Sequence, residues 1–198
     1  MKLATLALAL GLASPAFAAA PLSIDFEKSW ANGTEVGNTY AADGVTFTNV
    51  LGLSNNDGLG SLPGGNYYAG APSPLGVAFA QLDGVVNTAA YLNVTGGVSG
   101  GLSFFYSSPE AATGAIKAYS GLNGTGTLLG TISLNANSAD YTAWNKAVLS
   151  FGGTAHSFDL TGTANLVGLD NIAAVPEPTS VALLLAGGAL LLARRRRA

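Results

Sequence analysis

Turn-forming residues interrupt the chain from residue 21 to residue 174 roughly once every ten residues, a spacing typical of all-β domains. Pairs such as Gly96-Gly97, Gly100-Gly101, Asn123-Gly124 and Gly152-Gly153 favour chain reversals. The runs between them are short and apolar or alternating, and no window repeats apolar residues with helical period over a dozen positions. The body of the chain is therefore predicted to be all-β.

The alternating runs predict ten strands in one domain, and so many short strands favour a single β-sandwich. The domain is long enough to bury a core of its own. Residues 51–76, rich in Gly, Pro and Asn, are predicted to form one long loop. The predicted strands are 22–27, 45–50, 77–82, 89–94, 102–106, 115–119, 128–134, 143–151, 156–160 and 164–173.

The N-terminus has the three parts of a secretory signal peptide. A short basic region, Met1-Lys2, precedes an apolar run from Leu3 to Leu12, and Ala16-Phe17-Ala18 gives a small-x-small cleavage site. We expect cleavage after Ala18. Residues 1–18 are then the signal peptide and residues 19–174 the β-sandwich domain.

The C-terminus carries a short proline-flanked motif, an apolar run and a basic end. The motif is Val175-Pro176-Glu177-Pro178, and no charge occurs from there until Arg194. Residues 179–193 would form a single transmembrane helix of 15 residues, about 22 Å long. This is somewhat shorter than the roughly 20 residues that usually span a bilayer. The arginine cluster is expected to stay on the cytoplasmic side; its members are Arg194, Arg195, Arg196 and Arg197.

This order of motif, apolar stretch and terminal arginines resembles the PEP-CTERM sorting tail of Gram-negative envelope proteins, over residues 175–198. The resemblance implies handling by signal peptidase and by an exosortase-type sorting enzyme, with cleavage near Glu177. It also implies export to the cell envelope, outer surface or extracellular matrix, after transient anchoring in the inner membrane, in an organism that makes extracellular polysaccharide.

The body resembles, more loosely, the secreted jelly-roll domains that often precede such tails. The matching stretches are Ile24–Glu27, Tyr40–Phe47, Ala118–Leu128 and Gly168–Ile172. The resemblance implies a jelly-roll-like sandwich in which the first and last strands lie close together.

Four oxygen-bearing residues of these terminal strands are candidate metal ligands. Asp25 and Glu27 are two apart, so both would project from one face of a strand, and Asp170 and Asn171 lie in the last predicted strand. Hard oxygen ligands suit Ca²⁺, and the jelly-roll resemblance implies a structural calcium ion there. The alternative is that Asp25 and Glu27 are edge charges and that Asp170-Asn171 caps a turn.

Aromatic side chains in or beside predicted loops could stack on sugar rings. We select Tyr67 and Tyr68, inside the long loop, as candidate ligand-binding residues; the alternative is that they mark a short strand. Trp144 is expected to fill the core from a strand end. The full set is Trp30, Tyr40, Tyr67, Tyr68, Tyr141 and Trp144.

Charge and missing residue types exclude several classes of function. From Pro21 to Ala174 there are three lysines against ten acids, a balance of −7, which argues against nucleic acid as a partner. There is no cysteine for a thiolate site and one histidine, His156, which excludes a multi-histidine zinc site. No nucleophile or metalloprotease motif occurs. We therefore expect a non-catalytic surface or matrix protein associated with exopolysaccharide; the alternatives are a carbohydrate-binding module with a defined glycan and, less favoured, a polysaccharide hydrolase.

Overall fold

The computed structural model describes residues 22–28, 33–54, 70–73, 76–175 and 187. The all-β prediction for the body is confirmed within these ranges, which form ten strands and two short 3-10 helices. The elements are β1 (Ser23–Ile24), β2 (Thr34–Glu35), η1 (Ala41–Asp43), β3 (Val45–Thr48), β4 (Val50–Ser54), β5 (Gly76–Ala80), β6 (Tyr91–Ser107), β7 (Ala112–Tyr119), β8 (Leu128–Leu134), β9 (Asn145–Asp159), η2 (Thr161–Thr163) and β10 (Gly168–Val175).

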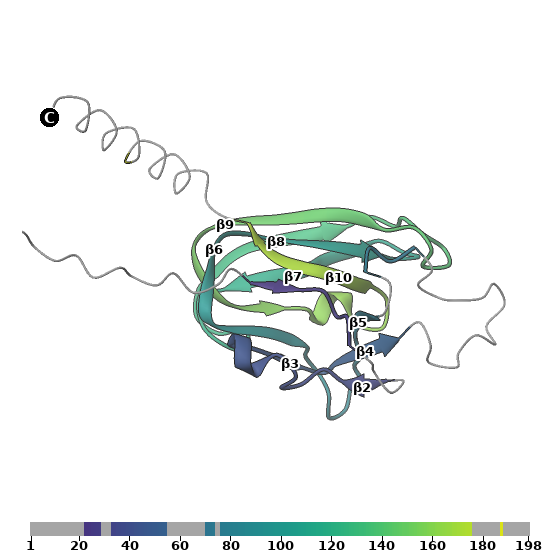
Figure 1. The fold of residues 1–198 in the computed structure, drawn as a ribbon, viewed down its shortest axis with the longest axis horizontal. Helices are drawn as coiled ribbons and strands as arrows, with labels where there is room; N and C mark the ends of the chain where they lie inside the picture. Colours follow the sequence, from purple (N-terminus) through teal and green to yellow (C-terminus); the bar gives the residue numbers. More distant parts are fainter. Residues whose placement is uncertain (1–21, 29–32, 55–69, 74–75, 176–186, 188–198) are drawn as a thin grey trace, which may run out of the picture.

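The strands form one continuous antiparallel sheet in the order β2-β4-β5-β10-β6-β9-β7-β8, with β1 added to β10 and β3 added to β6. Figure 1 shows this sheet curved back on itself, so that the fold is sandwich-like. It differs from the expected jelly roll in that hydrogen bonds run unbroken from one layer into the other.

Two long strands carry the sheet from one layer to the other. The start of β6 pairs with β3 and with the end of β9, and the rest of β6 pairs with β10 and with the start of β9. The ladder between β6 and β9 shifts register at two places. Gly97, Gly100 and Gly153 have φ values of 73°, 88° and 81°, which L side chains rarely adopt. The glycine pairs predicted to be turns are therefore bulges at which paired strands bend together.

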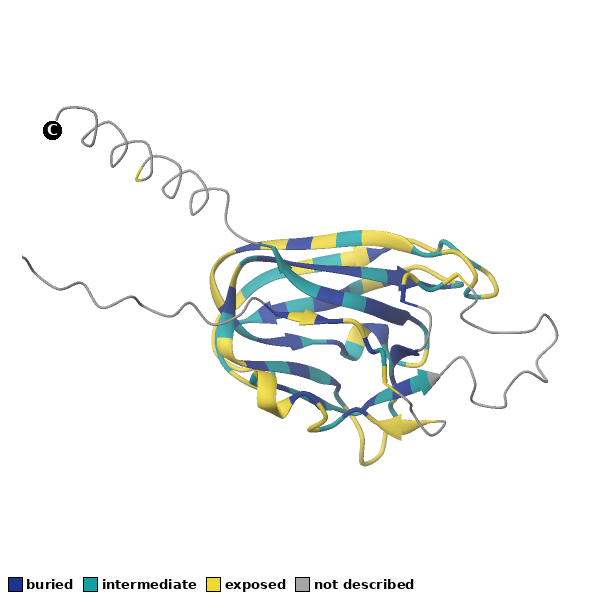
Figure 2. Ribbon diagram, in the orientation of Figure 1, coloured by how far each residue is buried: buried dark blue, intermediate teal, exposed yellow. Residues whose placement is uncertain are grey.

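The bent sheet encloses a single hydrophobic core, and buried residues alternate along the strands (Figure 2). Because successive side chains in a strand point to opposite faces, one face of each layer supplies the core. The largest fully buried side chains include Phe26, Phe104, Phe158, Leu92, Leu102, Ile116, Leu160, Leu169 and Ile172.

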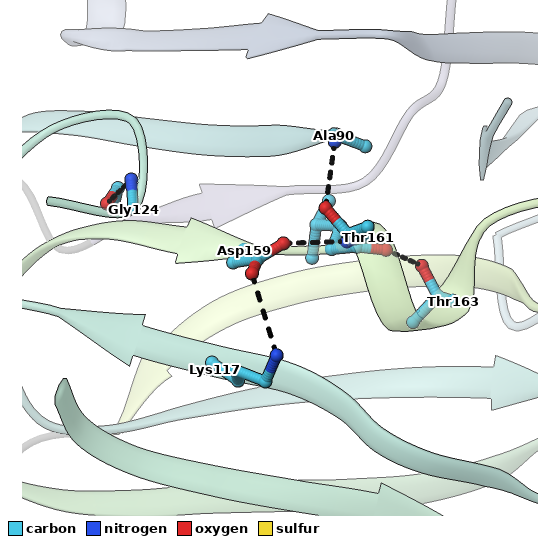
Figure 3. A network of polar contacts seen from close by, with 8 residues as sticks. Ala90, Lys117, Gly124, Asp159, Thr161 and Thr163 are labelled. Carbon is cyan, nitrogen blue, oxygen red and sulfur yellow. Dashed lines mark hydrogen bonds and ion pairs between the residues drawn. The ribbon is translucent and has the colours of Figure 1, made fainter. Parts of the chain in front are cut away.

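A polar network ties the end of β9 to its neighbours (Figure 3). Asp159 accepts a hydrogen bond from the backbone N–H of Thr161 at 2.9 Å, and its other oxygen lies 3.9 Å from the ammonium of Lys117 on β7. The hydroxyl of Thr161 accepts a hydrogen bond from the N–H of Ala90, next to β6. These contacts fix η2 where the chain leaves β9 for β10.

Several predicted boundaries were wrong. The predicted strands 89–94 and 102–106 both belong to β6, and 143–151 and 156–160 both belong to β9. The run predicted as strand 45–50 is divided at Asn49, whose φ of 54° separates β3 from β4. β4 extends to Ser54 and pairs with β5, so the start of the predicted 51–76 loop is strand. The strand predicted at 164–173 begins at Gly168, because a hydrogen-bonded turn follows η2.

No helix in the described part of the chain is long and apolar enough to cross a membrane. The predicted signal peptide, residues 1–18, lies outside the described residues. The predicted transmembrane helix at 179–193 also lies outside them, except for Gly187.

Candidate functional site at the first and last strands

The terminal strands are neighbours, as the resemblance to jelly-roll domains implied. β1 pairs antiparallel with β10, with Ile24 opposite Ile172. The backbone departs from strand geometry beside this ladder on both sides: Phe26 has a φ of 57°, and Asn171, with a φ of 48°, lies in a bulge of β10. A positive φ is uncommon for a bulky residue such as phenylalanine. The fully buried ring of Phe26 packs edge-on against Tyr40 and Phe47, and this packing stabilises the unusual backbone.

A fully buried carboxylate, that of Asp170, lies at the bulge. One carboxylate oxygen accepts hydrogen bonds from the hydroxyl of Ser73 at 2.6 Å and from the N–H of Asn171 at 2.7 Å. The other accepts the N–H of Ser73 at 2.9 Å. The Ser73 hydroxyl is also 2.6 Å from the carbonyl oxygen of Asp25. We call Asp170, Ser73 and the carbonyl of Asp25 the acidic cradle.

The two acidic residues of the first strand do not present a matched pair of carboxylates to this cradle. Asp25 is exposed, and its carboxylate accepts the N–H of Glu27 at 3.1 Å, so its carbonyl oxygen is what reaches Ser73. Glu27 is half-buried and close enough to Asp170 to influence its charge. The prediction that both side chains project from one strand face was wrong, because β1 ends at Ile24 and Phe26 turns the chain.

Burial dominates the electrostatics of the cradle. Loss of solvent raises the pKa of Asp170 to about 6, despite the hydrogen bonds from Ser73 and Asn171, and the negative charge of Glu27 adds to the increase. The pKa of the Tyr40 hydroxyl is also raised, by burial first and then by Asp25 and Glu27. Further negative charge is therefore unfavourable near both the Asp170 carboxylate and the Tyr40 hydroxyl.

The cradle provides hard oxygens suited to calcium. No group of three or more Asp, Glu, His or Cys side chains capable of holding a metal occurs in the described part of the chain, so a calcium ion here would need a mixed donor set. The two Asp170 oxygens, the Ser73 hydroxyl and the Asp25 carbonyl form such a set. Asn171 takes part through its backbone N–H.

The aromatic residues selected for sugar stacking divide into three groups. Tyr67 and Tyr68 lie outside the described residues, as does Trp30. Tyr40 is only 5% exposed, so the suggestion that it stacks on a sugar was wrong. Tyr141 and Trp144 are half-buried and serve the fold. The Tyr141 hydroxyl donates to the carbonyl of Leu166, and the indole of Trp144 lies against Gly168, outside the buried core that Trp144 was expected to fill.

Of the sorting residues, only Val175 is described, as the last residue of β10, opposite Gly101 of β6. His156, considered as a general base, is half-buried on β9 with Nδ1 3.3 Å from the carbonyl oxygen of Val94. The remaining sorting residues, Pro176, Glu177, Pro178, Arg194, Arg195, Arg196 and Arg197, lie outside the described residues.

Ser73 is the member of the cradle that sequence reasoning missed. It lies in the segment predicted as a long loop, 97 positions before its partner Asp170. A single serine among Gly and Pro residues gives no local signal of such a long-range contact.

Comparison with known proteins does not assign a family. Neither a protein-family model nor a curated protein matches the sequence. Two solved structures, both cleaved adhesin domains of Lys-gingipain, are similar to the chain. One is 17% identical, with a TM-score of 0.48, and covers 79% of this chain and 100% of its own. The other, from Porphyromonas gingivalis, is 15% identical, with a TM-score of 0.47, and covers 80% of this chain and 99% of its own.

Proposed function

We propose that the protein is an exported, non-catalytic component of the cell surface or extracellular matrix, sorted through its PEP-CTERM tail and associated with extracellular polysaccharide. The observation that carries this proposal is in the sequence: a signal-peptide pattern precedes the β domain and a sorting-tail pattern follows it. β10 runs to Val175, the residue that precedes Pro176 of the motif.

The intact mass of the exported protein tests the sorting step. We expect a mass that lacks residues 1–18 and the chain beyond a cleavage point near Glu177. Glu177→Ala, or loss of the exosortase-type enzyme, should leave an uncleaved species in the inner membrane. Glu110→Ala, an acidic residue of the folded body, is the matched control and should be processed normally. An exported form that keeps its arginine cluster would contradict the proposal.

A carbohydrate-binding module with a defined glycan is the second candidate. The two candidates differ in affinity: a module binds one glycan saturably, whereas a matrix component is retained through many weak contacts. Tyr67→Ala with Tyr68→Ala tests the stacking hypothesis, since loss of saturable binding would favour the module. A hydrolase is the least favoured alternative, and glycan turnover abolished by His156→Ala would establish it.

The charge of the body determines how it can attach to an anionic matrix. A domain of net charge −7 is repelled by acidic polysaccharide unless a divalent cation bridges the two. Retention of the protein by an acidic exopolysaccharide should therefore fall when the cation is chelated. Retention that is unchanged in EDTA would contradict this mode of attachment.

We also propose that the acidic cradle holds a structural Ca²⁺, with Asp170, Ser73 and the Asp25 carbonyl as ligands and Glu27 nearby. Adding CaCl₂ to EDTA-treated protein should raise the Tm by about 5 °C at saturation. Asp170→Asn should abolish most of this increase, whereas Asp140→Asn, at an exposed carboxylate, should preserve it. A Tm that does not respond to calcium would exclude the site.

A further inference from the structure

A concave region lies at one edge of the sheet, beside β2, the edge strand that is three strands away from β10 in the strand order. It is a pocket of about 180 Å³ lined by polar side chains and two leucines. Its volume is below the roughly 300 Å³ at which pockets for drug-sized ligands begin, which limits the occupant to about one small ring. We call it the edge pocket; its lining residues are Glu35, Asn49, Leu51, Gln81, Leu82, Asp83 and Asn87.

One wall of the edge pocket is held by Asn49, the residue that separates β3 from β4. Its backbone N–H donates to one carboxylate oxygen of Glu35 at 3.2 Å, and its side-chain amide donates to the carbonyl of Ala89 at 2.8 Å. Its own carbonyl accepts the N–H of Gln81 at 3.0 Å. Three separate segments are thus fixed around one asparagine.

The opposite wall is the loop that follows β5. One oxygen of Asp83 accepts the N–H groups of Val85, Val86 and Asn87, at 2.8, 2.9 and 2.9 Å. Asn165 fixes the preceding residue: its amide oxygen accepts the N–H of Leu82 and its NH₂ donates to the Leu82 carbonyl. The pocket is therefore formed before any ligand arrives, which lowers the entropy cost of binding.

The polar groups of the pocket leave part of their hydrogen-bonding capacity unused. In the described part of the chain, the second oxygens of Glu35 and Asp83 have no hydrogen-bond partner, and neither do the side-chain amides of Gln81 and Asn87. Carboxylates only accept hydrogen bonds, whereas amides both donate and accept. A ligand matched to this set presents several O–H groups that donate and accept at neighbouring positions.

The two carboxylates and the two leucines that line the pocket restrict the chemical class of the ligand. Two carboxylates make the pocket negative, which disfavours phosphates, sulfates and uronic acids. Leu51 and Leu82 provide apolar surface for C–H groups. A ligand with one ring, adjacent hydroxyls, an apolar C–H face and no negative charge meets all of these conditions.

We propose that the edge pocket binds one neutral sugar residue, with Glu35, Asp83, Gln81 and Asn87 pairing its hydroxyls over a floor of Leu51 and Leu82. The inference deepens the proposed association with polysaccharide and rests on it for the source of the sugar. It also adds a site distinct from Tyr67 and Tyr68.

The test is a titration of the exported protein, ¹³C-labelled at Leu and Val methyl groups, with D-glucose, D-galactose, D-mannose and D-glucuronate in EDTA. At least one neutral hexose should shift the Leu51 and Leu82 methyl resonances with a Kd on the order of 1 mM. D-glucuronate should bind at least about tenfold more weakly, because like charges repel. No methyl shift with any of the three neutral hexoses would overturn the proposal.

Four variants separate the roles of the side chains. Gln81→Ala and Asn87→Ala each remove hydrogen bonds to the sugar and should weaken binding roughly 3- to 10-fold. Glu35→Gln and Asp83→Asn keep an oxygen for the backbone N–H groups but remove charge, so the preference against glucuronate should shrink. Asn135→Ala, an exposed asparagine just after β8 at the opposite edge of the sheet, is the matched control. Equal affinities in all five variants would place the sugar elsewhere and overturn the proposal.

Retention of the same proteins by the host exopolysaccharide, measured in parallel, distinguishes failure of the edge-pocket proposal from failure of the proposed matrix role. If wild type and all pocket variants are retained equally and no methyl resonance shifts, the edge-pocket proposal is overturned and the matrix role is supported. Methyl shifts without retention of wild type would support the pocket and contradict the matrix role.

Discussion

The acidic cradle and the edge pocket each contain an aspartate that accepts backbone N–H groups, but their surroundings differ. Asp170 is fully buried, and burial raises its pKa to about 6. Asp83 is exposed, and hydrogen bonds from Val85, Asn87 and Val86 lower its pKa. The same kind of hydrogen bond is outweighed by desolvation in one place and dominates in the other.

The comparison separates two uses of a carboxylate. In the cradle, most of the hydrogen-bonding capacity of Asp170 is taken by Ser73 and Asn171 deep in the fold, so the group serves structure and, in our proposal, a cation. In the edge pocket, Asp83 uses one oxygen to shape its loop and presents the other to solvent. Substitutions in the first region should therefore act mainly on stability, and substitutions in the second mainly on binding.

The largest loss of stability should follow truncation of the ring beside the cradle. Phe26→Ala removes a fully buried phenylalanine that packs against Tyr40 and Phe47, and should lower the free energy of unfolding by about 4 kcal/mol. Urea unfolding measures the change, with the half-buried floor residue Leu82→Ala as the matched truncation in the edge pocket. A Leu82→Ala loss as large as that of Phe26→Ala would contradict the distinction between the two regions.

Asp170→Ala should have the next largest effect. It leaves the N–H groups of Ser73 and Asn171 buried without an acceptor and should cost about 3 kcal/mol in the free energy of unfolding. Asp83→Ala is the direct comparison, and its loss should be clearly smaller because water can replace the carboxylate at an exposed loop. Equal losses in urea unfolding would show that burial does not distinguish the two aspartates.

The same contrast explains what could be predicted from the sequence. Local patterns gave the all-β class and most of the strands, and the resemblance to secreted jelly-roll domains correctly implied adjacent terminal strands. Local patterns could not show that the paired glycines of β6 and β9 would form bulges within long strands, since Gly96-Gly97 has the same sequence signature as a turn.

The candidate site was predicted only in part for a similar reason. Asp170 was correctly brought near the first strand, but the period-two pattern put the Asp25 and Glu27 carboxylates on one face. It could not anticipate the positive φ of Phe26, which tertiary packing stabilises. The edge pocket gave no signal in the sequence, because its residues come from three segments that meet only after β2, β4 and β5 have paired.

A smaller effect is expected at the wall of the edge pocket. Asn165→Ala removes both hydrogen bonds to Leu82 and places alanine at a φ of 58°, so it should cost about 1 kcal/mol in the free energy of unfolding. It should also weaken sugar binding, although Asn165 does not line the pocket. Asn165→Gly relieves the backbone strain without restoring the hydrogen bonds, and should recover part of the stability but not the affinity. Recovery of both would show that the hydrogen bonds do not position Leu82.

The smallest effect should be the pH response of the loop after β5. Because the hydrogen bonds favour the ionised form of Asp83, its folded pKa lies below its unfolded value. Its stabilising contribution is then fully present above the ordinary aspartate range and is lost as the pH falls through the lowered pKa. The exchange protection factors of Val85, Val86 and Asn87, which correct the rates for the intrinsic pH dependence of amide exchange, should therefore be high at neutral pH and fall only in acid. Asp83→Asn keeps an acceptor that does not titrate in this range, so it should remove the pH response while retaining most of the protection. Protection in wild type that is independent of pH would show that the ionised carboxylate does not hold the loop, and the pocket wall would then depend on Gly84 and its contact with Asn87 alone.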